Sequence, residues 1–369
     1  MAGHSVCIDF RIDAAKIVNP VERKTLVQDI LPIVEPFTGT LTEITSCELP
    51  DGSFIFIFSS NKKMTVTIKL YLEGVVCTTV EYYAKNVDEQ IIQNGDGRNL
   101  EKQLTEKFNC DNAKVLPAIK RAPVINPYFT TSDDRILEYD VDEILFDEKS
   151  DFQRVQIYHT KSYGNMLVLD DLQNLAESDL SYTQGLMNKA NENFGNKEIL
   201  ILGGGDGALL FELLKENPQF VTMIDIDEIV MKSCRKHLRS VCGDVLDNYD
   251  GKNYKVIVGD AIAYMKQYVK EKKVFDYVFA DLTDVPISQT PRGEHWDFMR
   301  TIMELGTSLL KPNTGKYMTH AIGIQSENAL KMFEEQFLKL PIKVKLNRTN
   351  DHVPSFKENW CFYQATRQS

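Results

Sequence analysis

Beyond residue 178 the apolar positions fall into short runs that alternate with stretches of helical spacing. The runs that have the length of buried strands are Ile199–Leu202, Val221–Ile224, Val256–Val258, Tyr277–Ala280, Lys316–His320, Ile342–Leu346 and Trp360–Ala365. The stretches with helical spacing are Ala208–Lys215, Ile229–Leu238, Ala261–Val269 and Glu327–Leu338. Strands that alternate with helices predict a largely parallel, doubly wound sheet, so we expect a Rossmann-like α/β domain over residues 178–369.

The N-terminal part has the pattern of a separate α/β domain over residues 1–115. Apolar spacing predicts a helix over Val21–Val34, although Pro32 weakens its last turn. The other expected elements are strands at Phe54–Phe58, Met64–Leu72 and Val75–Tyr83 and a helix at Arg98–Phe108. The segment contains no catalytic constellation, which favours a structural or assembly role.

A small β-hairpin domain is expected over residues 121–177. Prolines at 117, 123 and 127 discourage regular structure and indicate a linker. Short β-like segments follow at Ile136–Val141, Val155–His159 and Met166–Leu169. Ser178 or Asp179 is predicted to cap a helix that runs through Met187.

Composition and charge narrow the classes of function. The 369 residues carry a net charge of −11, which disfavours nucleic acid as a partner and favours a cation. No apolar run is long enough to cross a membrane, and charged residues near the N-terminus replace the apolar centre of a signal peptide. The seven cysteines include no CxxC pair and fit a reducing compartment. We therefore expect a cytoplasmic protein with neither membrane nor nucleic acid as its partner.

Carboxylates follow each of the first four predicted strands of the C-terminal domain. In chain order they are Asp206, in the loop Gly203-Gly204-Gly205-Asp206-Gly207, then Asp225, Asp260 and Asp281. Ligands of a doubly wound sheet bind beyond the carboxyl ends of its strands, where these carboxylates are expected. With the usual strand order the first and fourth strands are neighbours, so Asp206 and Asp281 are expected to flank the reacting centre.

The glycine loop points to a nucleoside without phosphate. Asp206 would repel a pyrophosphate at the helix N-terminus, and the loop contains no lysine. Asp225, about twenty residues beyond the glycines, is placed to accept both ribose hydroxyls. Asp260 is placed to accept the amino group of an adenine. A nucleoside sulfonium together with an amine-bearing second substrate fits such an acidic site.

Metal and hydrolase chemistry find no support in the sequence. The six histidines form no HExxH motif, and the cysteines lack zinc spacing. A GxSxG nucleophile motif is also absent from the sequence. We expect no bound metal.

Several stretches resemble a known family, the aminopropyltransferases that include the spermidine and spermine synthases. They are LILGGGDG (Leu200–Gly207), NLAESDLSYT (Asn174–Thr183), CGDVLDN (Cys242–Asn248) and DLTDVPIS (Asp281–Ser288). The last two are typical of the spermine synthase branch, whereas GGGDG is shared with spermidine synthases. The resemblance extends over roughly residues 115–369.

The resemblance implies transfer of an aminopropyl group from decarboxylated S-adenosylmethionine, a co-substrate, to spermidine, with spermine and methylthioadenosine as products. It implies a methyltransferase-type sheet, an N-terminal domain similar to S-adenosylmethionine decarboxylase, a homodimer and no cofactor. Asp281 would be the proton acceptor. The residues implied to hold the nucleoside are Gln153, Gly203, Gly204, Gly205, Asp225, Asp260 and Ala261. Those implied to hold the polyamine are Tyr182, Asp206, Asp284, Phe356 and Glu358.

Two departures from the family pattern concern the acceptor. Phe356 stands where the motif VPSYxE has tyrosine, and Asp284 stands where spermine synthases commonly have a small apolar residue and spermidine synthases have aspartate. A spermidine synthase that uses putrescine therefore stays open as an alternative. A methyltransferase is disfavoured because the carboxylates at the strand ends would repel the carboxylate of that enzyme's S-adenosylmethionine. A catalytically silent dimerisation partner is disfavoured by the presence of both Asp206 and Asp281.

Overall fold

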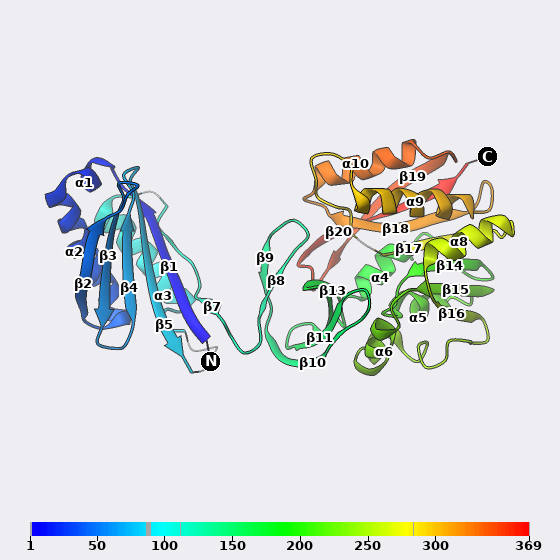
Figure 1. The fold of residues 1–369 in the computed structure, drawn as a ribbon, viewed down its shortest axis with the longest axis horizontal. Helices are drawn as coiled ribbons and strands as arrows, with labels where there is room; N and C mark the ends of the chain where they lie inside the picture. Colours follow the sequence, from blue (N-terminus) through cyan, green and yellow to red (C-terminus); the bar gives the residue numbers. More distant parts are fainter. Residues whose placement is uncertain (1, 86–89, 111, 283, 369) are drawn as a thin grey trace. The chain divides into compact units, whose positions relative to one another are not determined.

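The chain is described by a computed structural model over residues 2–85, 90–110, 112–282 and 284–368 and forms two compact units (Figure 1). One unit spans Met1–Asn126 and the other Pro127–Ser369. The division between the two units lies at residue 126, within the predicted proline-containing linker, and the predicted boundary near 178 remains a prediction. Residues 119–121 pair with the first strand of the N-terminal unit, and Val155 and Leu200 share one core, so the hairpins and the large sheet form a single unit.

The N-terminal unit is an antiparallel sheet with helices. Its strands are β1 (Ala2–Arg11), β2 (Leu41–Glu48), β3 (Phe54–Ser60), β4 (Thr65–Leu70), β5 (Val75–Ala84), β6 (Lys114–Val115) and β7 (Ile119–Arg121). Their order is β2-β3-β4-β5-β1, with β6 and β7 both paired to the free side of β1. The helices are α1 (Ala15–Val18), α2 (Pro20–Thr38) and α3 (Asn94–Phe108).

The strands and helices predicted for this unit are confirmed, but several of its elements were not predicted. The sequence analysis missed β1, β2 and the short elements α1, β6 and β7. Almost every side chain of β2 is exposed, so β2 carries no clear apolar signal. The helix α2 continues through Pro32 and Pro36, where the sequence indicated a weakened end. Its buried side chains, among them Ile30 and Val34, belong to the core of the unit, and this packing outweighs the backbone hydrogen bonds that the prolines remove.

The C-terminal unit contains the predicted doubly wound sheet. Its strands are β14 (Glu198–Gly203), β15 (Phe220–Asp225), β16 (Tyr254–Val258), β17 (Tyr277–Asp281), β18 (Lys316–Gly323), β19 (Val344–Val353) and β20 (Glu358–Arg367). Their order is β16-β15-β14-β17-β18-β20-β19, and all run in the same direction except β20, which pairs antiparallel with both β18 and β19. The expected contact between the first and fourth strands is confirmed by the pairing of β14 with β17.

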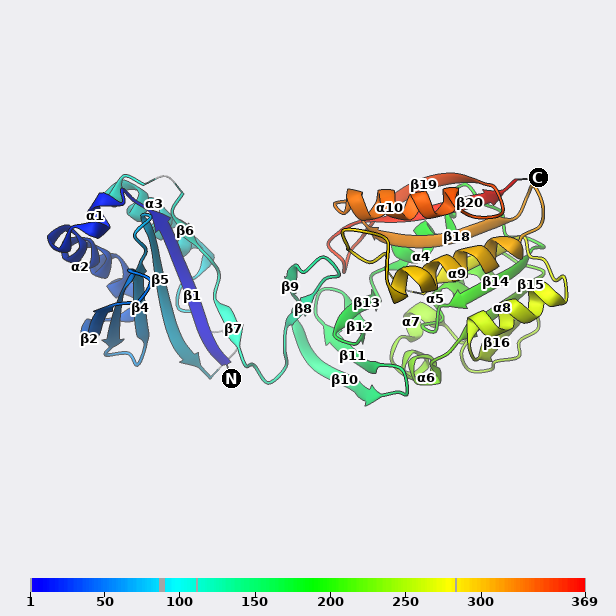
Figure 2. The same ribbon diagram turned by 45° about the horizontal axis from the view of Figure 1, so that its top comes forward.

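Helices cover both faces of this sheet, which explains why its central strands are apolar throughout. The helices α8 (Ala261–Lys270), α9 (Glu294–Ser308) and α10 (Glu327–Leu338) lie on one face (Figure 2). The helices α4 (Leu180–Met187), α5 (Ala208–Leu214), α6 (Glu228–His237) and α7 (Arg239–Cys242) lie on the other. No helix in the described part of the chain is long and apolar enough to span a bilayer.

The predicted hairpins precede the sheet in the same unit. Strands β8 (Tyr128–Thr130) and β9 (Ile136–Glu138) form a two-stranded hairpin. Strands β10 (Val141–Lys149), β11 (Arg154–Thr160), β12 (Gly164–Leu169) and β13 (Leu172–Ala176) form an antiparallel sheet in chain order. Both structures contribute to the walls of the cavity described next.

Candidate active site

A cavity of about 670 Å³ opens at the carboxyl ends of β14, β15 and β17. Eleven of the predicted site residues line it: Gln153, Tyr182, Gly203, Gly204, Gly205, Asp206, Asp225, Asp281, Asp284, Phe356 and Glu358. Asp260 and Ala261 are not among the described residues that line it. The carboxylate of Asp260 instead caps helix α8, where it accepts a hydrogen bond from the Ile262 amide at 2.8 Å.

The glycine loop brings the ends of three strands into close approach. Gly203 pairs with Asp281 and has φ of +82°, and an added Cβ would collide with the Asp281 carbonyl oxygen. At Gly205 an added Cβ would lie 2.7 Å from Asp225 Oδ2. Residues without side chains are therefore required for Asp225 and Asp281 to sit on either side of this loop.

Asp206 and Asp225 are half-buried carboxylates that neighbouring backbone amides hold in place. Asp206 Oδ1 accepts a hydrogen bond from the Ala208 amide at 2.7 Å, and Asp225 Oδ1 accepts one from the Asp227 amide at 2.8 Å. Burial raises the pKa of Asp206 above its usual range. Burial, assisted by the charge of Asp206, raises the pKa of Asp225 to about 6.

Asp281 is held by the phenol of Tyr182, which donates a hydrogen bond to its Oδ1 at 2.8 Å. Burial and then the charges of Asp206 and Asp225 raise the pKa of Asp281 to about 7, against the opposing effect of the tyrosine hydrogen bond. Burial raises the pKa of Tyr182 well above 10, so the phenol stays protonated and remains a donor.

Asp284 faces the cavity beside His320. Burial among the cavity walls raises the pKa of Asp284 to about 7, although 39% of its side chain stays exposed through the opening. Burial lowers the pKa of His320 to about 4, so its imidazole is neutral. The 3.6 Å separation of His320 Nδ1 from Asp284 Oδ1 is therefore neither an ion pair nor a hydrogen bond.

Aromatic rings form one wall of the cavity. The ring of Phe356 lies 5.8 Å from that of Tyr182 and 4.7 Å from that of Trp360, both in edge-on arrangements. Phe356 is 9% exposed and contributes no polar atom. This packing keeps water away from the phenol that donates to Asp281.

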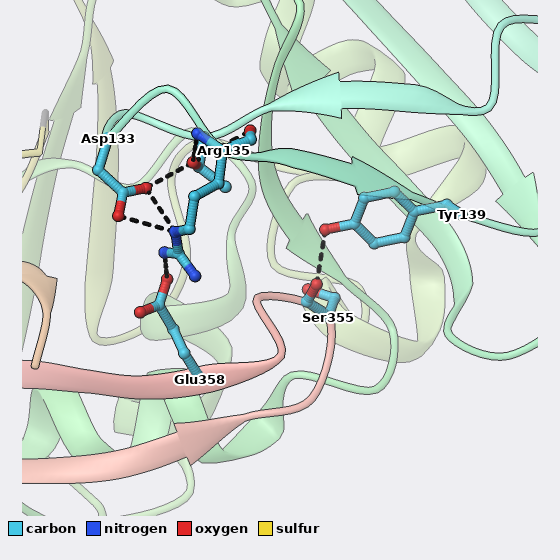
Figure 3. A network of polar contacts seen from close by, with 6 residues as sticks. Asp133, Arg135, Tyr139, Ser355 and Glu358 are labelled. Carbon is cyan, nitrogen blue, oxygen red and sulfur yellow. Dashed lines mark hydrogen bonds and ion pairs between the residues drawn. The ribbon is translucent and has the colours of Figure 1, made fainter. Parts of the chain in front are cut away.

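Glu358 is the first residue of strand β20 and forms an ion pair with Arg135 of the β8–β9 hairpin (Figure 3). Arg135 Nη2 donates to Glu358 Oε1 at 2.6 Å. Glu358 Oε2, Trp360 Nε1 and His320 Nδ1 are buried polar atoms without a hydrogen-bond partner among the described residues, and all three residues line the cavity. Such atoms are rare in native proteins and indicate that this cavity receives polar groups.

Sequence reasoning missed Arg135 and Trp360 and gave His320 no role. Arg135 lies in a short polar turn, and nothing in its neighbourhood in the sequence connects it with Glu358. Asp179 occupies the predicted N-cap position of α4, and the helix ends at Met187 as predicted. The Asp179 side chain does not cap the helix, because it accepts hydrogen bonds from the amides of Ala176 at 2.7 Å and Ser355 at 3.0 Å. Asp179 thereby joins the start of α4 to the loop that precedes β20.

Gln153 reaches the cavity from the turn between β10 and β11. Its Nε2 donates to Asp227 Oδ2 at 3.0 Å, while Asp227 Oδ1 accepts from the Ile229 amide at the start of α6. The hairpin sheet is thus tied to the strand end that carries Asp225. The cavity as a whole combines carboxylates that can bind cations with two acids, Asp281 and Asp284, whose pKa values are raised to about 7.

Comparison with known families matches most of the C-terminal unit. Residues 180–369 match the spermine/spermidine synthase domain. Residues 128–177 match the spermidine synthase tetramerisation domain. The first match covers the Rossmann-like sheet with α4, and the second covers strands β8 to β13.

Individual relatives carry related names. A polyamine aminopropyltransferase of Aeropyrum pernix is 29% identical over 240 residues, which are 63% of this chain and 72% of that one. Polyamine aminopropyltransferase 1 of Hyperthermus butylicus is 34% identical over 149 residues, which are 40% of this chain and 50% of its own. The chain thus spans about half the length of several curated relatives.

A solved structure of similar fold is the spermidine synthase from Thermotoga maritima, with a TM-score of 0.52 and 18% identity. The alignment covers 65% of this chain and 78% of that one. The fold of this chain is therefore similar to that of this spermidine synthase.

The raised pKa of Asp281 has a consequence for stability. Between pH 4 and 7 the folded state keeps a proton that the unfolded state has lost, so the free energy of unfolding falls as pH rises through this range. We expect Asp281→Asn to raise the melting temperature by at least about 2 °C at pH 8 and to leave it unchanged near pH 4. Calorimetry at both pH values measures this.

The matched control is Asp250→Asn, at a carboxylate whose side chain is 75% exposed. Its effect on the melting temperature is expected to be small at both pH values. An Asp281→Asn variant that is equally or less stable than the parent at pH 8 contradicts the assigned burial of charge.

Proposed function

The chain belongs to the spermine/spermidine synthase family, and on this premise we propose that it transfers the aminopropyl group of decarboxylated S-adenosylmethionine to spermidine. The products would be spermine and methylthioadenosine. The observation that carries the proposal is the placement of Asp281, a half-buried carboxyl between the glycine loop and Tyr182, where its pKa is raised to about 7. The reaction needs a base at this position, because an ammonium has no lone pair with which to attack.

The cost of proton transfer explains why the pKa of the accepting carboxylate must be raised. An alkyl ammonium has a pKa near 10.4 and an ordinary aspartate one near 4, a difference of about six pKa units. With Asp281 at about 7 the difference narrows to about three, which saves roughly 4 kcal/mol of the cost of the proton transfer. The neighbouring sulfonium and the aromatic wall lower the amine's pKa further.

The step itself is a displacement at carbon. Asp281 accepts the proton of the acceptor's ammonium, and the amine nitrogen forms a bond to the methylene carbon beside the sulfonium. The carbon–sulfur bond breaks, and sulfur keeps the electron pair as the neutral thioether of methylthioadenosine. Alignment of nitrogen, carbon and sulfur by the cavity supplies much of the remaining acceleration.

Roles for the other cavity residues follow from charge. Asp225, the glycine loop and Gln153 would hold the nucleoside. Asp206 and Glu358 would hold the acceptor's distal ammonium groups, which stay charged. Decarboxylated S-adenosylmethionine is a co-substrate in this proposal, and the reaction uses no resident cofactor.

Asp284 favours a second candidate, transfer to putrescine by a spermidine synthase. Asp284 lines the cavity, and aspartate stands at this position in spermidine synthases, whereas spermine synthases commonly have a small apolar residue there. Phe356 points the same way, because its ring offers no hydroxyl to a longer polyamine. The two acceptors differ by a single aminopropyl unit, so product analysis separates them.

We expect the purified protein to form spermine when it is given decarboxylated S-adenosylmethionine and spermidine. We also expect Asp281→Asn, which keeps the size of the side chain but removes the base, to reduce turnover at least about 100-fold. Chromatography of the polyamines, with putrescine and spermidine offered separately, measures both. Methylthioadenosine binding by Asp281→Asn serves as the control for an intact site.

Spermidine formed from putrescine, with no spermine formed from spermidine, would replace the first candidate by the second. Transfer to neither amine would overturn the proposed function. Near-normal turnover by Asp281→Asn would remove the assigned role of the base.

For assembly we propose a homodimer whose main contact is the N-terminal unit, which would resemble S-adenosylmethionine decarboxylase. Along β1 and β5 the side chains alternate between buried and partly exposed, so one face of the sheet packs in the core and the other is partly open. Cys7, Asp9 and Thr79 lie on the partly open face, whereas Val6 and Ile8 lie in the core. A sheet face of small and polar residues suits contact with an identical face.

Light scattering tests the assembly. We expect twice the chain mass of 42.1 kDa for the full protein and a single chain mass for a fragment that begins at Pro127, because the fragment lacks the proposed contact. A monomeric full-length protein, or a dimeric fragment, would contradict this role of the N-terminal unit.

A further inference from the structure

The turn between β8 and β9 puts a protein cation inside the candidate acceptor site. Arg135 donates from Nη2 to Glu358 Oε1 at 2.6 Å, and its Nε donates to both oxygens of Asp133 at 2.9 and 2.7 Å (Figure 3). All three residues line the cavity. The Arg135 guanidinium is therefore bound to Glu358, the carboxylate that the proposed function assigns to an ammonium of the substrate.

Glu358 is built to hold a cation. Its side chain is only 9% exposed, and its second oxygen, Oε2, has no hydrogen-bond partner among the described residues. One oxygen is thus taken by Arg135, while the other is enclosed beside Gly323, where an added Cβ would collide with it. A cation in the cavity therefore meets Glu358 on the side that Arg135 occupies, and an incompletely paired, buried carboxylate favours its binding.

Local hydrogen bonds set the shape of the turn that carries Arg135. The Thr131 amide donates to the Arg135 carbonyl at 2.9 Å, and the Arg135 amide donates to Thr131 Oγ1 at 3.0 Å. Asp134, between them, has a φ of +60°. These contacts present the arginine side chain to Glu358 from a defined backbone.

The base of the hairpin is attached to the same loop that carries Glu358. The phenol of Tyr139 donates to the Ser355 carbonyl at 2.7 Å (Figure 3), and Lys357 Nζ donates to the Glu138 carbonyl at 2.7 Å. Hairpin and loop are therefore held together independently of the Arg135–Glu358 pair. The arginine side chain can leave Glu358 without separation of the two segments.

We propose that Arg135 determines acceptor specificity by competing with a distal ammonium of the polyamine for Glu358. The inference rests on the proposed function and refines its acceptor. A diamine has one distal ammonium, which Asp206 satisfies, and it leaves the Arg135–Glu358 pair intact. A triamine has a second distal ammonium, which must displace the guanidinium or bind beside it against its charge.

The expected size of the effect follows from exposure. The Arg135 side chain is 43% exposed, so water screens its interaction with Glu358 and with an incoming ammonium. An effect of about tenfold on the affinity of the triamine is expected for such a partly exposed pair, rather than a complete block.

Titration calorimetry in the presence of methylthioadenosine tests the proposal without relying on turnover. We expect Arg135→Gln to bind spermidine about tenfold more tightly than the parent protein does and to bind putrescine within twofold of it. Arg135→Lys keeps the positive charge and is expected to stay within threefold of the parent for both amines.

The matched control is Arg154→Gln. Arg154 is 48% exposed and holds Asp147 with the same two donors, Nε at 2.9 Å and Nη2 at 2.6 Å, but it is not among the described residues that line the cavity. We expect this variant to bind both amines as the parent does. A melting curve for each variant confirms that it is folded before titration.

The outcomes separate the two proposals. Binding of neither amine by the folded parent overturns the proposed function and this inference with it. If the parent binds spermidine but Arg135→Gln binds it equally or more weakly, only the inference is overturned. The inference is also overturned if Arg135→Gln gains equal affinity for spermidine and putrescine. It is likewise overturned if Arg135→Lys gains as much affinity for spermidine as Arg135→Gln does.

Discussion

Repulsion between carboxylates crowded at the ends of adjacent parallel strands is the constraint on which the rest of the site depends. Asp206, Asp225 and Asp281 follow strands β14, β15 and β17, and the registers of these strands bring them around one glycine loop. Burial raises the pKa of each, and the charge of Asp206 adds to the rise at Asp225 and Asp281. Cationic ligands or protons reduce this repulsion. In the proposed function a sulfonium and a polyamine would be the cationic ligands, and Asp281 would bind the proton.

The surrounding structure keeps this costly arrangement in place through contacts that are distant in the sequence. Asp179, 1% exposed, accepts hydrogen bonds from the amide and the hydroxyl of Ser355, 176 residues away. It thereby fixes helix α4, which carries Tyr182, against the loop that precedes Glu358. The proposed base, its phenolic donor and the carboxylate proposed to hold a distal ammonium thus share one scaffold, as expected where stability is given up locally for function.

Much of the fold could be predicted from the sequence, because strands buried on both faces give continuous apolar runs and their order follows a general rule. Asp206 and Asp281 were assigned to adjacent strand ends on that rule alone, and the pairing of Gly203 with Asp281 confirms it. Contacts between distant segments could not be predicted. The pairing of Arg135 with Glu358 depends on a turn of five residues that carries no apolar pattern, and the exposed strand β2 has none either.

The most direct test of the account is a ¹³C NMR titration of the Asp281 carboxyl carbon, assigned by loss of its signal in Asp281→Asn. The account predicts a midpoint near pH 7 in the unliganded protein and a lower midpoint in Asp206→Asn, because removal of the neighbouring charge makes ionisation easier. A midpoint near the ordinary value of 3.8, or one that Asp206→Asn leaves unchanged, would contradict it.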